Sequence, residues 1–415
     1  MSGKLPFKRK IINDPLYGFV TISDQLIFDL IEHPYFQRLR RIEQLGLASL
    51  VYPGALHTRF HHALGAMHLM GQAIETLRSK GFDISAKEAQ GVTIAILLHD
   101  IGHGPFSHAL EHQIAGAVSH EEITMIFMQQ LNNEFNNRLD TAIAIFNNTY
   151  PRKFLHQLVS GQLDMDRLDY LMRDSFYTGV NEGVISTDRI LKMLTISDDN
   201  LAVELKGIYS IEKFIVARRL MYWQVYYHKT VIAAEYMLVN ILKRARALEI
   251  SGVALPASVA LKFFLQHPIK GKQFAFSPEI LPIFAQLDDY DLFSAIKEWA
   301  SYPDKILCYL CKALINRELF RVVISTSPQP EEMTAEIRNN IKCKLSLSEE
   351  DIGYFTRSGE ISNSAYDPDH DRITIVDKNG ERWDISGLSE QLNIAVYNKI
   401  VSKFFTYYPK WAENG

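Results

Sequence analysis

Histidine is concentrated in one short part of this chain. Nine of its fourteen histidines lie between His57 and His120, and His99 is followed directly by Asp100. An acidic run at residues 164–170 comes next. Imidazole and carboxylate groups gathered in this way suit a divalent metal ion with acid–base groups beside it. We therefore expect a metal-dependent hydrolase, with phosphoesters as its substrates.

Four residues are the candidate metal ligands. His99 and Asp100 end an apolar stretch and stand just before a glycine-rich turn at residues 102–104. A charged pair in such a buried stripe is unfavourable unless it is paired or binds a metal. His62 and Asp166 belong to two other helical segments. Three elements would thus contribute the set His62, His99, Asp100 and Asp166.

Taken singly, several of these residues have simpler explanations. His62 alone fits a core or surface histidine, and Asp164 and Asp166 fit helix caps. Because these residues occur together with His99 and Asp100, a single metal site is the better explanation. Two imidazoles and two carboxylates leave positions open for water and a phosphate oxygen. We expect one divalent ion (Mn, Fe, Mg, Co or Zn), because the mixture suits an open, octahedral site better than a closed structural zinc site.

Other members of the histidine cluster are candidates for moving protons. His103 lies four positions after His99 and shares its face if the helix continues that far. His108 opens the next helical segment, with Glu111 three positions later. A carboxylate beside an imidazole raises its pKa and fixes its tautomer, which suits a proton donor near neutral pH. His120, which precedes an acidic residue, is a third candidate.

Hydrolysis of a phosphoester also needs positive charge beside the phosphoryl oxygens. Arg59 precedes His62 by three positions, and Arg167 follows Asp166 directly. Arg218 lies on a long helical segment further along the chain. These three arginines are the candidates for holding phosphate.

The segment that carries Arg218 has an aromatic face. Tyr222, Tyr226 and Lys229 follow it at spacings of four, four and three, so that all four share one face of a helix. Such a stripe alone fits a solvated amphipathic face. The run at residues 222–228 is nevertheless very aromatic for a surface, and a nucleoside would stack on such planes.

Helical patterns dominate the chain up to about residue 320. A short hairpin, Lys10–Asn13 and Gly18–Ile22, precedes them around a Pro-Leu-Tyr-Gly turn. Capping boxes begin helices at Ser85 and Ser119. Helices are predicted at about 60–80, 85–98, 107–115, from 119 onwards, and 211–248.

Composition changes after residue 321. A turn or linker at residues 326–330 precedes an expected helix, and two strands are predicted near Arg372–Val376 and Glu381–Ile385, joined by an Asn-Gly turn. A last helix is expected from about Leu388 to Tyr407. We therefore predict a mainly α protein with two units: a helical body at residues 1–325 and a small C-terminal α+β unit at residues 326–415.

The bulk composition excludes several classes of protein. With 44 basic and 48 acidic residues, the formal net charge of −4 does not favour nucleic-acid binding. No apolar run approaches the roughly 20 residues needed to span a bilayer. The N-terminus lacks the apolar segment of a secretory signal, and three cysteines give no disulfide framework. We expect a cytoplasmic protein without membrane contact.

An ordered series of motifs resembles the HD-domain phosphohydrolase superfamily. Its centre is the run His99-Asp100-Ile-Gly-His103-Gly-Pro-Phe-Ser-His108. The whole series is similar to the deoxynucleoside triphosphate triphosphohydrolase branch, the dGTPase-like and sterile-alpha-motif/HD enzymes. The resemblance covers roughly residues 10 to 250 well and the remainder loosely. The other motifs that carry it are Asp14-Pro-Leu-Tyr-Gly18, Phe36-Gln-Arg-Leu-Arg40, Gln44-Leu-Gly46, Pro53 to His62, Asp164 to Tyr170, and Tyr226-Tyr-His-Lys229.

The resemblance implies a role for each candidate residue within a helical HD-domain body. It implies one metal ion on the four predicted ligands. The catalytic cluster that it implies is His103, His108, Glu111 and His120. The implied triphosphate ligands are Arg59, Arg167, Tyr170 and Arg218. The sugar pocket would comprise Gln44, Leu45, Asp174 and Tyr226, and Tyr226 packed under the ribose would disfavour a 2′-hydroxyl.

The reaction implied is hydrolysis of a deoxynucleoside triphosphate at the α-phosphorus, which gives deoxynucleoside and tripolyphosphate. Two alternatives stay open. One is an HD phosphohydrolase that acts on nucleoside monophosphates or cyclic nucleotides, expected if further histidines bind a second ion. The other is a nucleotide-sensing module without turnover, whose signature would be a lost metal ligand, and no ligand is missing.

The chain departs from its relatives at a few positions. His61 stands where relatives often carry an acidic residue, and Arg167 stands where some carry lysine, which keeps the charge and changes its geometry. Some relatives bind a regulatory nucleotide at the positions of Glu32, Gln37 and Arg40. The resemblance thus implies a second nucleotide site and assembly into a homo-oligomer, a dimer or a tetramer.

Overall fold

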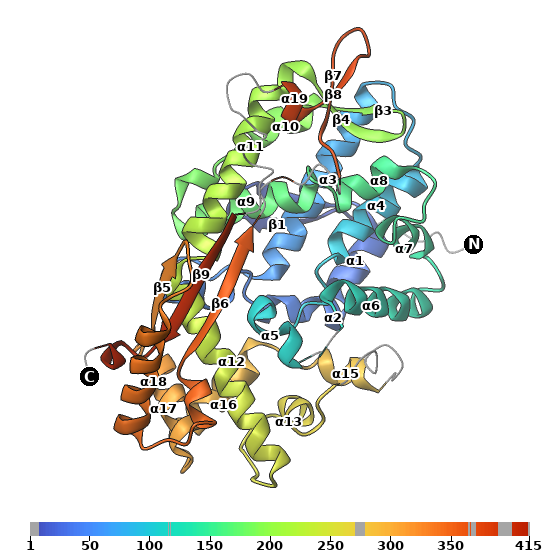
Figure 1. Ribbon diagram of the computed structural model, residues 1–415. Coiled ribbons are helices and arrows are strands. Elements are labelled where there is room, and N and C mark those ends of the chain that lie inside the picture. Colours follow the sequence, from blue (N-terminus) through green and yellow to red (C-terminus); the bar gives the residue numbers. More distant parts are fainter. Residues whose placement is uncertain are drawn as a thin grey trace.

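The computed structural model describes residues 8–114, 116, 118–269, 279–363, 366, 371–388 and 401–413, and of residues 107, 108, 111 and 112 it describes the backbone alone. The protein is mainly helical, as predicted, with two small sheets and an N-terminal hairpin (Figure 1). The hairpin joins β1 (Lys10–Asp14) to β2 (Gly18–Ile22) in antiparallel register. This confirms the predicted hairpin.

Helix α3 (Arg59–Ser79) is at the centre of the body. It packs against α4 (Ala86–Leu98) and α9 (Met165–Thr178). The contact with α9 is close at Gly65, where an added Cβ would lie 2.0 Å from Asp169 Oδ1. Helix α4 begins at the predicted capping box, in which Ser85 Oγ accepts from Glu88 N and the Glu88 carboxylate accepts from Ser85 N. Its apolar residues 94–98 are fully buried, so this helix is a core element.

Further helices surround this centre. Among the helices of the described ranges, none is both long and apolar enough to cross a bilayer. Their bounds are α1 Gln25–Glu32, α2 Pro34–Gln37, α5 Ser107–Ile114, α6 His120–Glu134, α7 Asp140–Phe146, α8 Lys153–Val159, α10 Thr187–Met193, α13 Val259–Gln266, α15 Ile280–Phe284, α16 Asp289–Trp299, α17 Lys305–Ile315, α18 Glu331–Leu345 and α19 Ile385–Leu388.

The prediction of one continuous helix at residues 211–248 is wrong, because the structure has two helices there. Helix α11 (Ile208–Met221) runs into a π-helical turn at Tyr222–Tyr226, and α12 (Lys229–Ile250) begins after a break. Tyr227 N donates to Tyr222 O at 2.7 Å, which is the five-residue spacing of a π turn. His228 then caps α12, because its Nδ1 accepts from Thr230 N. The bulky aromatic run therefore interrupts the helix.

Two sheets connect distant parts of the chain. One has the order β3 (Leu194–Ser197), β4 (Asn200–Glu204), β7 (Thr374–Val376), β8 (Arg382–Asp384), and β4 pairs with β7 in parallel. The β7–β8 hairpin confirms the predicted strand pair. The other sheet has the order β5 (Arg321–Ser325), β9 (Val401–Tyr408), β6 (Arg357–Asn363), and it lies along α12 (Figure 1). The division of the chain at residue 325 remains a prediction, and both sheets contain strands from each side of it.

The predicted last helix is wrong for residues 401–408, which form β9; residues 389–400 lie outside the described part of the chain. This segment is rich in aromatic and β-branched residues, which favour strands. Phe405 and Tyr407 are buried, and both rings pack against Tyr236 of α12. Hydrogen-bonded partners on both edges then fix β9 as the central strand.

Candidate metal centre and active site

Three helices bring two histidines and one aspartate together. His62 lies in the first turn of α3, His99 ends α4, and Asp166 lies in the first turn of α9. The Nε2 atoms of the two histidines are 3.3 Å apart, and Asp166 Oδ1 lies 3.1 and 3.5 Å from them. All three candidate ligand atoms lie within 4.8 Å of one another. This is the spacing expected of ligands around one ion.

Asp100, the fourth predicted ligand, lies at the edge of this group. Its carboxylate oxygens are 3.3 Å from His99 Nε2 and 3.8 Å from His62 Nε2. One of them accepts a hydrogen bond from Arg59 Nη1 at 2.5 Å. Burial raises the pKa of Asp100, but the neighbouring His99 and Arg59 charges outweigh it and hold that pKa well below its usual range. Asp100 is therefore an ionised carboxylate beside the cluster.

The second nitrogen of each histidine is held by another group. His62 Nδ1 lies 2.8 Å from Asp169 Oδ2, and His99 Nδ1 lies 2.6 Å from the carbonyl oxygen of Ile96. Both partners are acceptors, so each Nδ1 carries the hydrogen and each Nε2 lone pair is available to an ion. Such supporting contacts orient the ligands of metal sites. The donor set thus fits a divalent cation.

A buried chain of charges supports His62. Asp169 accepts from Arg173 Nε at 2.9 Å and from Nη2 at 3.0 Å, and Arg173 Nη1 donates to Asp14 of the hairpin at 2.8 Å. The side chains of Asp169 and Arg173 are fully buried. Asp14 and Asp169 belong to the sequence motifs, but no role was predicted for either. The signal for Asp169 and Arg173 is their spacing from Asp166, three and then four residues along one helix.

The electrostatics show competition between a proton and a cation. Burial lowers the pKa of His62, but its bonds to Asp166 and Asp169 outweigh burial and raise that pKa to about 10. The imidazoles of His62 and His99 hold the pKa of Asp166 well below its usual range, against the effect of burial. A divalent cation on these atoms would compete with the proton on His62, so metal binding would be coupled to proton release.

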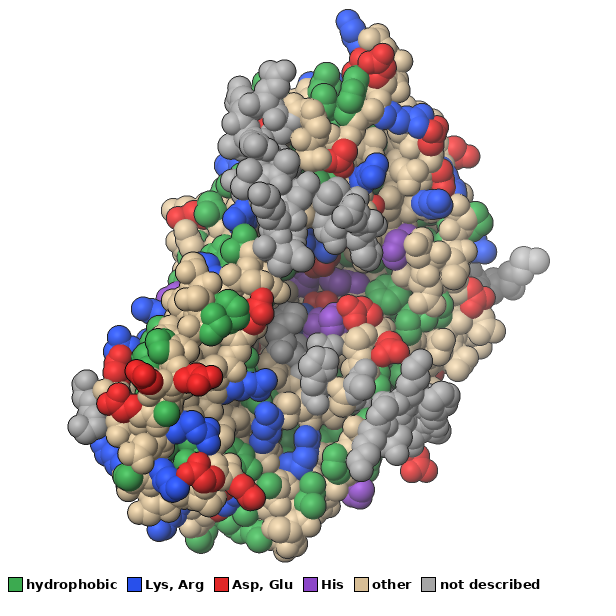
Figure 2. All heavy atoms as spheres, in the orientation of Figure 1, with side chains coloured by type: hydrophobic (Ala, Val, Ile, Leu, Met, Phe, Trp, Pro, Cys, Tyr) green, Lys and Arg blue, Asp and Glu red, His purple; other side chains and the backbone are tan. Residues whose placement is uncertain are grey.

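A hollow of about 450 Å³ opens onto the cluster. In Figure 2, histidine and acidic side chains are visible at the bottom of a depression near the middle of the face shown. This volume is in the range of small-molecule sites. The residues lining it include the ligands His99, Asp100 and Asp166, together with His120, Arg167 and His156.

The structure places two of the four predicted catalytic residues. The rings of His103 and His120 stack with centroids 4.0 Å apart, and His103 Nε2 lies 3.3 Å from Asp100 Oδ1. Burial lowers the pKa of His103 well below its usual range, so this ring is neutral near pH 7. His108 and Glu111 belong to α5, but their side chains lie outside the described part of the molecule. Their role therefore stays a prediction.

Two of the three predicted phosphate-binding arginines, Arg167 and Arg218, contact one loop, residues 160–164, which precedes α9. Arg167 forms an ion pair with Asp164, and Arg218 Nη1 donates to Gln162 Oε1 at 3.0 Å. Tyr170 lies on the same helix as Arg167. Its ring is in edge-to-face contact with that of Tyr226, and the two ring centroids are 6.2 Å apart. The sequence did not predict that Gln162 and Asp164 hold the arginines.

Of the four residues predicted for the sugar pocket, Tyr226 is in direct contact with Asp174, which is 1% exposed. The hydroxyl of Tyr226 donates to Asp174 Oδ2 at 2.7 Å, and His57 Nε2 lies 2.7 Å from Oδ1. Gln44 N donates to the carbonyl of His57 at 2.9 Å, and Leu45 follows it. His57, which had no predicted role, therefore fixes the carboxylate that orients Tyr226.

Comparison with known proteins agrees with this geometry. The HD domain matches residues 59–174, which hold all the ligands, and the HD associated region matches residues 185–253. A crystal structure of a phosphohydrolase from Bacteroides thetaiotaomicron is 52% identical, with a TM-score of 0.94 over 97% of this chain and 100% of that chain. The protein belongs to the HD-domain phosphohydrolase family.

Two relatives within this family cover different shares of the HD-domain chain. YwfO of Bacillus subtilis is 34% identical over 341 residues, which are 80% of this chain and 76% of that protein. A SAMHD1 homolog of Dictyostelium discoideum, named a deoxynucleoside triphosphate triphosphohydrolase, is 31% identical over 255 residues, 57% of this chain and 49% of that protein. The similarity to the named triphosphohydrolase therefore extends over about half of that protein.

The three residues implied for a regulatory nucleotide lie before the HD domain. Glu32 ends α1 and is exposed. Arg40 Nε donates to Gln37 Oε1 at 2.8 Å, and its guanidinium lies 3.6 Å from the centroid of the Phe60 ring. Gln37 also donates to the carbonyl of Ile31 at 2.7 Å. A nucleotide site at these residues remains a prediction.

Proposed function

We propose that this HD-domain protein hydrolyses deoxynucleoside triphosphates to deoxynucleoside and tripolyphosphate, with one divalent metal ion. The observation that carries the proposal is the convergence of His62, His99 and Asp166 beside a hollow that Arg167 also lines. A bound divalent ion would polarise a phosphoryl oxygen and activate a water molecule. The metal would be held by His62, His99 and Asp166, with Asp100 beside them.

The arginines would bind the triphosphate of the substrate. Positive charge beside the phosphoryl oxygens stabilises the charge that develops during hydrolysis. Arg167 lines the hollow, and Arg59 and Arg218 are buried cations held by Asp100 and Gln162. Three guanidinium groups suit a triphosphate better than a single phosphate.

His103 would take part in proton transfer, and Asp174 would take part in binding the sugar. His103 would serve as an acid–base group, because its Nε2 lies 3.3 Å from Asp100 Oδ1, beside the candidate metal ligands. The hydrogen bond between Asp174 and the Tyr226 hydroxyl fixes the tyrosine that would pack under the deoxyribose. The resemblance to the SAMHD1 homolog supports this choice of substrate.

The test is a substrate panel with the products resolved. The full chain, loaded with Mn²⁺ or Mg²⁺, is incubated with the four dNTPs singly and in pairs, and with ribonucleotides, monophosphates and cyclic nucleotides. We expect deoxynucleoside and tripolyphosphate in equal amounts. Orthophosphate alone would contradict the proposal. The variant His99→Ala, which lacks a ligand, is the control for contaminating phosphatases.

Metal stoichiometry separates the proposal from its alternatives. We expect one ion per chain by elemental analysis, because the described residues hold one group of three or more candidate ligands. Two ions together with turnover of monophosphates or cyclic nucleotides would favour the alternative phosphohydrolase. Nucleotide binding without any product would favour a sensing module.

A further inference from the structure

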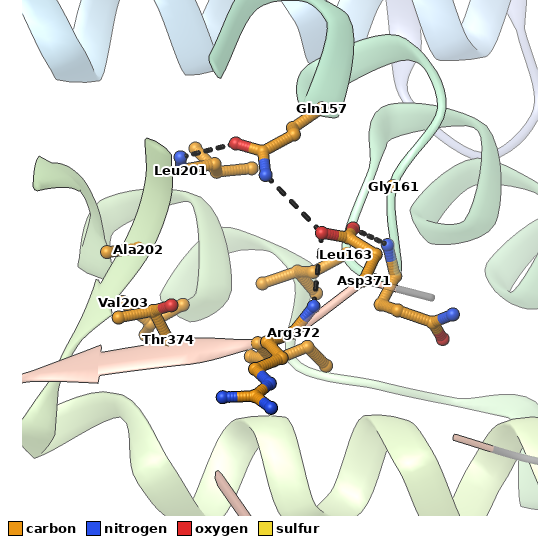
Figure 3. Close-up of a pocket in the computed structure, with 11 residues that line it drawn as sticks. Gln157, Gly161, Leu163, Leu201, Ala202, Val203, Asp371, Arg372 and Thr374 are labelled. Carbon is orange, nitrogen blue, oxygen red and sulfur yellow. Dashed lines mark hydrogen bonds between the residues drawn. The ribbon is translucent and has the colours of Figure 1, made fainter. Parts of the chain in front are cut away.

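The C-terminal part of the chain reaches the active-site loop through Asp371. This residue lies just before β7, and its carboxylate points at loop 160–164 (Figure 3). Asp371 Oδ2 accepts from Gln162 N at 2.9 Å, and Oδ1 accepts from Gln157 Nε2 at 3.3 Å. Asp371 Oδ1 also accepts from Arg372 N at 3.1 Å. One carboxylate thus joins the end of α8, the loop and the start of β7.

The neighbouring sheet places Asp371 at this point. Strand β7 pairs in parallel with β4, with Ala202 opposite Thr374. The Gln157 side chain completes the connection, because its Oε1 accepts from Leu201 N of β4 at 2.7 Å. The hollow between these residues has a volume of about 20 Å³, which suits a single water molecule and no larger ligand. The cluster therefore joins segments and is not a binding site.

The loop that Asp371 holds is the one that holds the arginines. The side chain of Gln162 accepts from Arg218, and Asp164 is paired with Arg167. Asp164 also fixes the loop itself, because its oxygens accept from Gly161 N at 2.9 Å and from Arg167 N at 2.7 Å. A shift of the loop at Gln162 N would therefore move both Gln162, which contacts Arg218, and Asp164, which contacts Arg167.

We propose that Asp371 is a positioning residue for phosphate binding, which acts by fixing loop 160–164 under Arg167 and Arg218. This inference rests on the proposed function, which assigns both arginines to the triphosphate. It gives the C-terminal part of the chain a role at the active site. Two of the candidate metal ligands, His62 and His99, are held by groups outside this loop, and Asp166 lies in the helix that the loop precedes. Metal binding should therefore depend on Asp371 less than phosphate binding does.

The test measures phosphate affinity and metal content separately, in the full chain. Asp371→Ala should weaken binding of inorganic tripolyphosphate about tenfold by calorimetry, the effect of losing a hydrogen bond to a buried group. Asp371→Asn should lose less, because its remaining oxygen can still accept from Gln162 N. Glu381→Gln, an exposed acid on the same β7–β8 hairpin, is the control with the same change in charge. Metal content should equal that of the wild type in all three variants.

Kinetics distinguish positioning from a general structural effect. With dNTP as substrate, Asp371→Ala should raise KM more than it lowers kcat, and combining it with Gln162→Ala should cost less than the sum of the two single losses. Unchanged tripolyphosphate affinity in a folded Asp371→Ala protein would overturn the inference, as would an equal loss of metal. If Asp371→Ala does not fold, the comparison of Asp371→Asn with Glu381→Gln decides.

The two proposals can fail separately. A wild-type protein that binds tripolyphosphate but hydrolyses no dNTP would contradict the proposed function, and a weaker affinity in Asp371→Ala would still support the role of Asp371. A wild-type protein that hydrolyses dNTPs while Asp371→Ala matches it in KM and affinity would contradict the role of Asp371 alone.

Discussion

The proposed metal side and the proposed phosphate side of the candidate active site are held in different ways. On the metal side, the charged pair Asp169–Arg173 behind His62 is fully buried, and both residues lie on α9 beside the ligand Asp166. On the phosphate side, the Arg167 side chain is 23% exposed, and its loop is held by Asp371 from the far end of the chain. Metal affinity and phosphate affinity should therefore respond to different substitutions.

The largest effect is expected from substitution of Asp166, a candidate metal ligand, because every step of the proposed reaction needs the metal ion. Asp166→Ala should remove bound metal and lower kcat/KM by about a thousandfold, since the ion contributes several kcal/mol to catalysis. Elemental analysis and initial rates measure the two losses. Asp188→Ala, an exposed acid in the first turn of α10, is the control. Retained metal with full activity would remove Asp166 from the site.

Support of the metal side is tested by Asp169→Asn. The amide keeps the shape of the side chain but weakens the bond to His62 Nδ1, so we expect metal affinity to fall about 10- to 100-fold. Titration with Mn²⁺ measures this loss. Activity should recover when metal is added to saturation, because the phosphate side is unchanged. An unaltered metal affinity would show that the buried charges serve only folding.

The phosphate side is tested by Arg167. Arg167→Ala should lower kcat/KM about 100-fold, with metal content unchanged, because it removes a cation that stabilises developing charge. Arg167→Lys should recover part of the loss, since it keeps the charge and loses the planar fork. Loss of metal in Arg167→Ala would contradict the separation of the two sides.

The smallest expected effect is a change in the free energy of unfolding with pH. Burial raises the pKa of Asp289 to about 7, against its bonds from the backbone of Glu43 and Phe106. The unfolded chain loses this proton near pH 4, so stability should fall as pH rises from about 4 to about 7. Burial also opposes ionisation of Asp169, but Arg173 and His62 outweigh it and lower that pKa to about 2. Its contribution is instead lost as pH falls from about 4 to about 2.

Urea unfolding between pH 3 and pH 8 measures these changes. Asp289→Asn should reduce the decline above pH 4 and leave the loss at low pH. A decline of the same size in Asp289→Asn would assign it to other groups, such as Glu43, whose pKa burial also raises to about 7.

The sequence brings the candidate metal ligands to notice because their signals are local, and the structure brings His62, His99 and Asp166 together. His99 and Asp100 interrupt an apolar run, and the helix that holds them begins at a visible capping box. His57 and Asp371 were missed because their partners, Asp174 and Gln162, are far away in sequence, and no spacing rule connects them. The C-terminal strand was mistaken for a helix because a short apolar run fits both structures. Its pairing with β5 and β6 decides between them.

The parallel pairing of β4 with β7 has a consequence for synthesis on the ribosome. Helices α3, α4 and α9, which bring the metal ligands together, emerge long before β7 does. If the helices assemble in the order in which they emerge, the candidate metal cluster forms before Asp371 can give loop 160–164 its last support.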